Sequence, residues 1–220
     1  MVFLHGYLSS KEAFTAQIKY FSRFFRVTAI DFLGFGRSAR LSEAFSVQDY
    51  AEWTREALQL LGVKKPHVIA HSFGCRVTVK LAAADPDFFD KILLTGAAGV
   101  VLKRGLRYQT KVKTYRLVRR FAPRYAERHF GSAEYRTLPP IMKESYKKIV
   151  NEDLRACARK VENEVLLVQG SEDTVTPKRE ADAYLACFRR GKMTVMDGGH
   201  FAFAEHPLIF NLIAEEFFYG

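Results

Sequence analysis

Cysteine and long apolar runs are scarce in this chain of 220 residues, and each scarcity excludes a class of protein. Three cysteines, Cys75, Cys157 and Cys187, are an odd number without metal-ligand spacing, so they predict reduced thiols in a cytoplasmic protein that holds no metal. No apolar run approaches the roughly twenty residues of a membrane span. The stretch before His5 is too short for a secretory signal, and no low-complexity tract is present.

What the chain does contain is typical of one globular domain with a substantial core. Hydrophobic residues make up 48% of it, and 19 phenylalanines and 10 tyrosines predict an aromatic-rich core or pocket.

The most informative segment surrounds Ser72. A β-branched run at residues 68–70 leads into His-Ser-Phe-Gly, and a helix is predicted over residues 75–84. Small residues two positions before and after the serine, Ala70 and Gly74, let the backbone turn sharply and hold the hydroxyl at the carboxyl end of a sheet. The pattern indicates a nucleophile elbow, with an ordinary helix N-cap at Ser72 as the alternative.

Two more polar residues follow later predicted strands. Asp173 comes soon after the apolar run at residues 165–169, and His200 follows residues 193–196 and two glycines. Parallel strands gather their carboxyl ends along one edge, so these side chains are expected to lie near Ser72. A serine hydroxyl needs an adjacent base, which an imidazole supplies near neutral pH and a carboxylate orients.

Two loops near the start complete the pattern. Residues 2–7 indicate a strand and a His-Gly turn, and residues 31–38, DFLGFGRS, follow the next predicted strand. With Ser72, Asp173 and His200 in this order, the chain resembles the α/β-hydrolase superfamily in its serine hydrolase, or esterase, branch. Serine at the elbow argues against the related dehalogenases and epoxide hydrolases, which use a carboxylate there.

The resemblance implies a role for each site residue. Ser72 is the expected nucleophile, His200 the base and Asp173 its orienting acid, and the backbone N–H groups of Tyr7 and Phe73 form the expected oxyanion hole. Glu172 and Asp197 remain alternative acids. His5 and His71 are expected to pack and shape turns, Asp31 and Arg37 to tie their loop together, and Cys75 to pack in its helix. The predicted pocket walls are Leu8, Leu102, Leu106 and Phe201.

The alternation of elements predicts an α/β fold with a mainly parallel, doubly wound sheet of about six strands and a small helical cap insert. Strands are expected at residues 2–4, 27–30, 67–70, 92–95, 165–169 and 192–196, and helices at 11–22, 47–61, 75–84 and 207–218. Residues 1–98 and 161–220 form the predicted core, and residues 99–160 the predicted cap. Family members usually have two or more strands before the His-Gly strand. The 27–30 strand is therefore expected near an exposed edge, which leaves dimerisation or a truncated gene model open.

The net charge of +10 is concentrated in the predicted cap. Between residues 103 and 128 a single acid, Glu127, accompanies ten basic residues: Lys103, Arg104, Arg107, Lys111, Lys113, Arg116, Arg119, Arg120, Arg124 and Arg128. Three interpretations compete: a solvated basic face, a site for an anionic substrate or acidic carrier, and contact with an anionic membrane surface. No nucleic-acid motif accompanies the charge.

The expected function is hydrolysis of a small to medium carboxylic ester through an acyl-enzyme, without a cofactor, in a monomer or homodimer. One alternative is a thioesterase, or a carbon–carbon hydrolase or lyase similar to the menaquinone-pathway synthase, acting on an anionic substrate. Another is a ligand receptor or scaffold with slow turnover.

Overall fold

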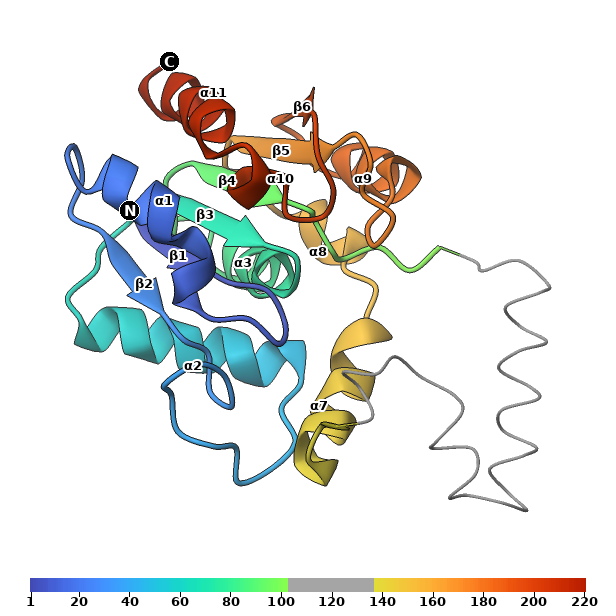
Figure 1. Ribbon diagram of the computed structural model, residues 1–220. Helices are drawn as coiled ribbons and strands as arrows, with labels where there is room; N and C mark the ends of the chain where they lie inside the picture. Colours follow the sequence, from blue (N-terminus) through green and yellow to red (C-terminus); the bar gives the residue numbers. More distant parts are fainter. Residues whose placement is uncertain (103–136) are drawn as a thin grey trace.

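The computed structural model describes residues 1–102 and 137–220. At its centre lies one sheet of six strands, all parallel, in the order β2-β1-β3-β4-β5-β6 (Figure 1). The strands are β1 (Val2–Leu4), β2 (Thr28–Ile30), β3 (Val68–His71), β4 (Ile92–Thr95), β5 (Val165–Gly170) and β6 (Gly191–Met196). The predicted α/β fold is confirmed, and every expected strand is present within one residue of its predicted bounds.

Helices cover both faces of the sheet (Figure 1). The described helical segments are the 3₁₀ turn η1 (Lys11–Phe14), α1 (Thr15–Phe21), α2 (Val47–Leu60), α3 (Phe73–Ala84), α7 (Pro140–Val150), α8 (Arg155–Ala158), α9 (Lys178–Leu185), α10 (Ala202–Glu205) and α11 (Pro207–Tyr219). The predicted 11–22 helix is divided into a 3₁₀ turn and an α-helix. Helix α9 was not predicted, because only two of its eight residues, Ala181 and Tyr184, are buried and its apolar pattern is weak.

The core is split between the two faces because successive strand residues point in opposite directions. In β1, Val2 and Leu4 belong to a cluster that includes α2, α3 and α9, whereas Phe3 belongs to a cluster with α1 and α11. Central strands therefore consist of continuous apolar residues, as parallel strands buried on both faces must. This two-sided packing holds the carboxyl ends of the strands in a common row.

Helix α2 illustrates how local sequence defines an element. It begins with a capping box, in which the Ser46 hydroxyl accepts from the Asp49 amide and the Asp49 carboxylate accepts from the Ser46 amide. It ends before Gly62, whose φ of 65° continues the chain in the left-handed region.

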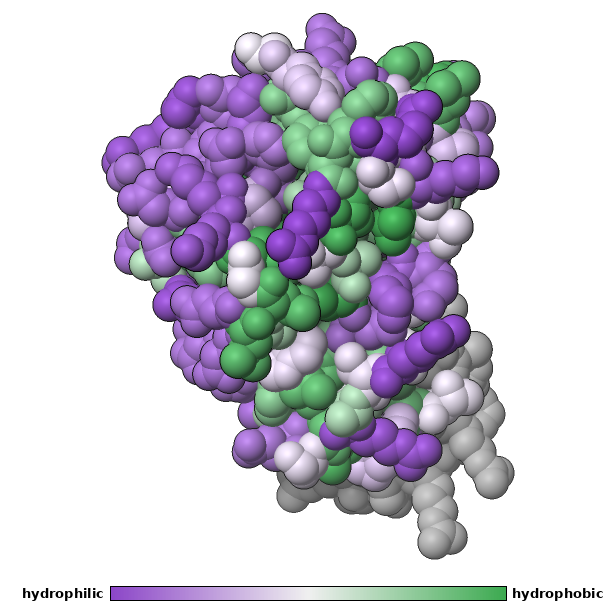
Figure 2. All heavy atoms as spheres, turned by 90° about the vertical axis from the view of Figure 1, so that its left-hand side faces the viewer, coloured by the Kyte–Doolittle hydropathy of each residue, from purple (hydrophilic) through white to green (hydrophobic). Residues whose placement is uncertain are grey.

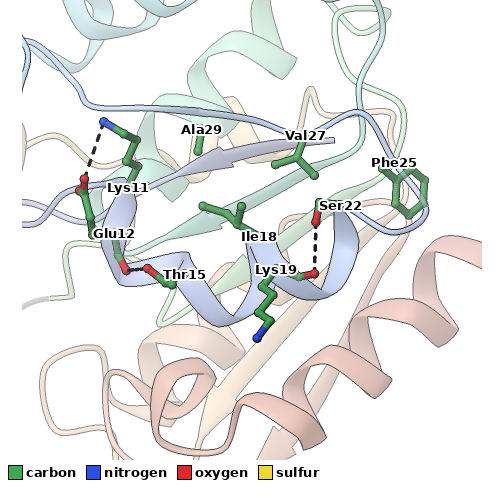
Figure 3. Close-up of a pocket in the computed structure, with 9 residues that line it drawn as sticks. All are labelled: Lys11, Glu12, Thr15, Ile18, Lys19, Ser22, Phe25, Val27 and Ala29. Carbon is green, nitrogen blue, oxygen red and sulfur yellow. Dashed lines mark hydrogen bonds and ion pairs between the residues drawn. The ribbon is translucent and has the colours of Figure 1, made fainter.

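Strand β2 lies at one edge of the sheet, as expected. Figure 2 faces this side and shows a band of apolar side chains between polar regions. A groove of about 700 Å³ follows the edge (Figure 3), lined by Lys11, Glu12, Thr15, Ile18, Lys19, Ser22, Phe25, Val27 and Ala29. None of the predicted site residues lines this groove.

Helices α7 and α8 fall within the predicted cap insert. Where the insert joins the core, the Leu154 amide donates to the Gly99 carbonyl and the Val101 amide to Asp153. Among the described residues, no helix is long and apolar enough to cross a membrane.

Candidate active site

Ser72 occupies a strained turn between β3 and α3. Its φ of 49° and ψ of −105° are unusual for a residue with a side chain, and its hydroxyl makes no capping hydrogen bond to the helix. The ordinary N-cap interpretation is therefore wrong. A Cβ at Gly74 would lie 2.2 Å from the Leu4 carbonyl oxygen, so the turn requires glycine there because α3 approaches β1 closely. A strained strand-to-helix turn of this kind is what the predicted nucleophile elbow requires, and the role of Ser72 as nucleophile stays a prediction.

Asp173 and His200 are brought together across 27 residues of sequence. His200 Nδ1 lies 2.8 Å from Asp173 Oδ2. The other carboxylate oxygen, Oδ1, accepts from the Val175 and Thr176 amides, each at 2.8 Å, and the Thr176 hydroxyl donates to Oδ2 at 2.7 Å. Because an ionised carboxylate only accepts, Nδ1 carries a proton and Nε2 is left with a lone pair. The imidazole is thus in the tautomer that a general base needs.

The carboxyl of Asp173 is held ionised. Burial raises its pKa, but the hydrogen bonds from His200 and Thr176 outweigh that effect and leave the pKa below its ordinary value. The contribution of Thr176 was not predicted, although its position in Ser-Glu-Asp-Thr-Val-Thr-Pro could have indicated a turn that caps the carboxylate.

The three candidate acids differ in burial and in their contact with His200. Glu172 and Asp197 are both exposed, whereas Asp173 is buried and bonded to His200. The loop that carries His200 is packed closely against β5, since a Cβ at Gly170 would lie 2.2 Å from the Gly199 carbonyl oxygen.

Tyr7 and Phe73 follow two neighbouring strands, β1 and β3, which pair in parallel register. Their ring centroids are 5.7 Å apart, so the two loops meet at the edge where the elbow lies. The Tyr7 hydroxyl also donates to the Met142 carbonyl of α7 at 2.8 Å. The use of their two backbone amides as an oxyanion hole stays a prediction.

His5 shapes the first loop, as expected. Its Nδ1–H donates to the Gly6 carbonyl at 2.7 Å and its Nε2 accepts from the Phe32 amide at 3.0 Å. Burial is the main cause that lowers its pKa. The ring therefore ties the loop after β1 to the loop after β2.

Asp31 holds the second loop together, as expected. Its carboxylate accepts from the amides of Lys11 and Arg37 and from the Lys11 ammonium. Burial opposes ionisation, but these donors prevail and lower the pKa of Asp31 to about 2. Arg37 contributes through its backbone amide in this network.

The predicted pocket residues are spread over several loops. Leu8 and Phe201 are 46% and 44% exposed, and the Phe201 ring lies 5.4 Å from that of His200. Leu102 packs against the hydrophobic core cluster that contains residues of α2 and α3. Leu106 and the basic segment 103–128 lie outside the described residues. Their roles as pocket walls stay predictions.

None of the three cysteines forms a disulfide. Cys75 is fully buried behind the elbow, and its burial raises the pKa of the thiol. A thiol kept protonated in this way is a poor nucleophile, which agrees with the expected packing role.

A parallel, doubly wound sheet with an elbow serine and an Asp–His pair at its carboxyl edge defines a class of α/β proteins that place their functional loops at that edge. A sequence model of the alpha/beta hydrolase fold family matches residues 1–139. The chain belongs to the alpha/beta hydrolase fold family.

Comparisons with individual proteins agree with this membership. An (E)-2-((N-methylformamido)methylene)succinate hydrolase of Acinetobacter baylyi is 29% identical over 92 residues, which are 42% of this chain and 35% of that protein. The match thus spans about a third of that relative's length.

Two solved structures are similar over nearly the whole chain. An esterase from Exiguobacterium antarcticum aligns with a TM-score of 0.80 at 18% identity, over 100% of this chain and 91% of its own. A meta-cleavage product hydrolase from Pseudomonas fluorescens aligns with a TM-score of 0.75 at 20% identity, over 99% and 89%. At these identities the likeness shows the fold.

Proposed function

We propose that this protein is a serine hydrolase that cleaves a small to medium carboxylic ester through an acyl-enzyme intermediate. The observation that carries the proposal is the 2.8 Å contact between His200 Nδ1 and Asp173, which leaves Nε2 free to take a proton at the edge of the sheet that carries Ser72. The strained elbow and the family membership support the same reaction class.

In the proposed mechanism, Ser72 Oγ attacks the ester carbonyl carbon while His200 Nε2 takes its proton. Asp173 stabilises the imidazolium that forms, and the amides of Tyr7 and Phe73 donate to the oxyanion. The C–O bond to the alcohol then breaks as His200 returns the proton to the leaving oxygen. Water then attacks the acyl carbon while His200 takes its proton. The bond between that carbon and Ser72 Oγ breaks as His200 returns the proton to Oγ, which releases the carboxylic acid and restores the free serine.

The test compares wild type with Ser72→Ala in labelling by a fluorophosphonate and in turnover of a p-nitrophenyl ester series. We expect labelling to vanish and kcat to fall at least ~10³-fold, a barrier increase of about 4 kcal/mol. Ser171→Ala, an exposed serine beside the Asp173 loop, is the matched control and should leave both unchanged.

Each other outcome has a distinct meaning. Ester turnover that survives in folded Ser72→Ala would exclude this serine as the nucleophile. Labelling of wild type with tight ligand binding but negligible turnover would favour the slow receptor instead.

A second candidate is hydrolysis of an anionic substrate. Ten basic residues between 103 and 128 would attract such a substrate, and the name of the Acinetobacter baylyi relative contains succinate, which is an anion. Turnover of paired esters with and without a distal carboxylate distinguishes the two candidates.

A further inference from the structure

The residue before the candidate nucleophile, His71, contacts the loop of the candidate base. His71 is the last residue of β3 and is 1% exposed. Its Nε2 lies 3.0 Å from the backbone carbonyl oxygen of His200, and the two rings have centroids 4.7 Å apart. The Phe201 and Phe203 rings, at 4.8 Å and 4.9 Å, enclose the same imidazole.

These contacts determine the tautomer of His71. A carbonyl oxygen only accepts, so Nε2 must carry the proton and Nδ1 must be the unprotonated nitrogen. Nδ1 is buried and has no hydrogen-bond partner among the described residues. It lies against the first loop, because a Cβ at Gly6 would be 2.8 Å from it.

The ring is also kept neutral. Burial, followed by the proximity of His200, lowers the pKa of His71 to about 3, and the opposing effect of Asp173 is smaller. His5 is the other titratable group that acts on it, and it also lowers the pKa. A neutral imidazole can lie beside His200 without repelling the imidazolium that general-base catalysis forms there.

We propose that His71 is a positioning residue: it fixes the positions of the His200 loop and the Gly6 loop relative to Ser72. Its backbone is continuous with the elbow, its Nε2–H anchors the base through the His200 carbonyl, and its Nδ1 edge supports the loop that leads to Tyr7. This role rests on the serine hydrolase function proposed above. It predicts that His71 affects the chemical step and has little effect on substrate binding.

The variant His71→Phe keeps a ring of similar size but removes the Nε2–H donor, and His71→Gln keeps a donor that can reach the same carbonyl. We expect His71→Phe to lower kcat about 10- to 100-fold, as misplacement of a base by up to 1 Å does, with KM changed less than about twofold. His71→Gln should recover most of the loss.

Active-site titration with a fluorophosphonate separates positioning from mere stability. A positioning role predicts full labelling at a reduced rate, with kcat per labelled site reduced. A purely structural role predicts a smaller labelled fraction with kcat per labelled site unchanged, and that result would overturn the proposal. Equal losses in His71→Phe and His71→Gln would overturn it as well.

One further measurement, made on the wild type, keeps the proposal testable if a variant does not fold. Imidazole ¹⁵N resonances of the wild type should show His71 neutral and protonated on Nε2 down to about pH 5; titration near pH 6.5 would refute the assignment. Wild type that is never labelled would instead overturn the proposed function, and this role with it.

Discussion

The pairing of Asp173 with His200 makes a specific prediction for Asp173→Asn. The introduced amide has one oxygen and one NH₂ group, which can be placed in two ways. Asp173 Oδ1 accepts from two backbone amides, whereas Oδ2 accepts from the Thr176 hydroxyl and His200. The oxygen will therefore stay at the Oδ1 position, because NH₂ there would leave the part-buried Val175 amide and the buried Thr176 amide without their acceptor, at a cost of about 1–3 kcal/mol for the buried one.

The NH₂ group then faces His200 Nδ1. To accept from it, the imidazole must give up its Nδ1 proton and carry the proton on Nε2, which can no longer act as a base. The same change in the serine-protease triad lowers kcat by about 10⁴-fold, which corresponds to about 5.5 kcal/mol, and we expect a loss of this order. The fold should survive, since the shape of the side chain and its backbone contacts are retained.

The assay is p-nitrophenyl ester turnover normalised to folded protein, with circular dichroism as the check on folding. Glu172→Gln and Asp197→Asn are matched controls, because both carboxylates are exposed, and neither should change kcat more than about twofold. If Asp173→Asn kept activity within tenfold of wild type, or if a control lost as much, the assignment of the acid would be refuted.

Two other predictions concern stability and the basic segment. Because the folded pKa of Asp31 is lowered from 3.8 to about 2, its ionised form stabilises the fold above pH 4, by about 2 kcal/mol, and this contribution disappears as the pH falls from about 4 to about 2. The free energy of unfolding in urea at pH 7 should be lower for Asp31→Asn by that amount, and the difference from wild type should be smaller near pH 3. The control Asp87→Asn changes an exposed side chain and should alter the free energy of unfolding by less than about 0.5 kcal/mol. Neutralising Arg116, Arg119 and Arg120 together should lower kcat/KM for carboxylate-bearing esters more than for neutral ones. Equal effects on both esters would mean that the basic segment is a solvated surface with no role in substrate selection.

Much of the fold followed from the sequence because its signals are local. Apolar runs of strand length and the glycines at 62 and 74 constrain the backbone within a few residues. The parallel arrangement then puts the loops after β1, β3, β5 and β6 on one edge. Helix α9 was not predicted because only Ala181 and Tyr184 are buried, and two apolar positions are too few to give a recognisable helical pattern in the sequence.

The sequence alone predicted the strand-to-helix turn at Ser72 and the types of residue that a base and an acid would need. Which carboxylate reaches His200, and in which tautomer the ring lies, was decided by the tertiary structure. Adjacent residues such as Glu172 and Asp173 have the same chemistry, and only the turn at Thr176 buries one and exposes the other.

His71 likewise has one feature that the sequence gives and another that only the folded structure shows. The sequence places it beside the elbow, but its contact with the His200 carbonyl joins residues 129 positions apart. Local patterns encode backbone geometry and chemical type, whereas the direction of a side chain toward a distant partner depends on how helices and loops pack around the sheet. That packing minimises the free energy of the whole chain, so it appears only in the folded molecule.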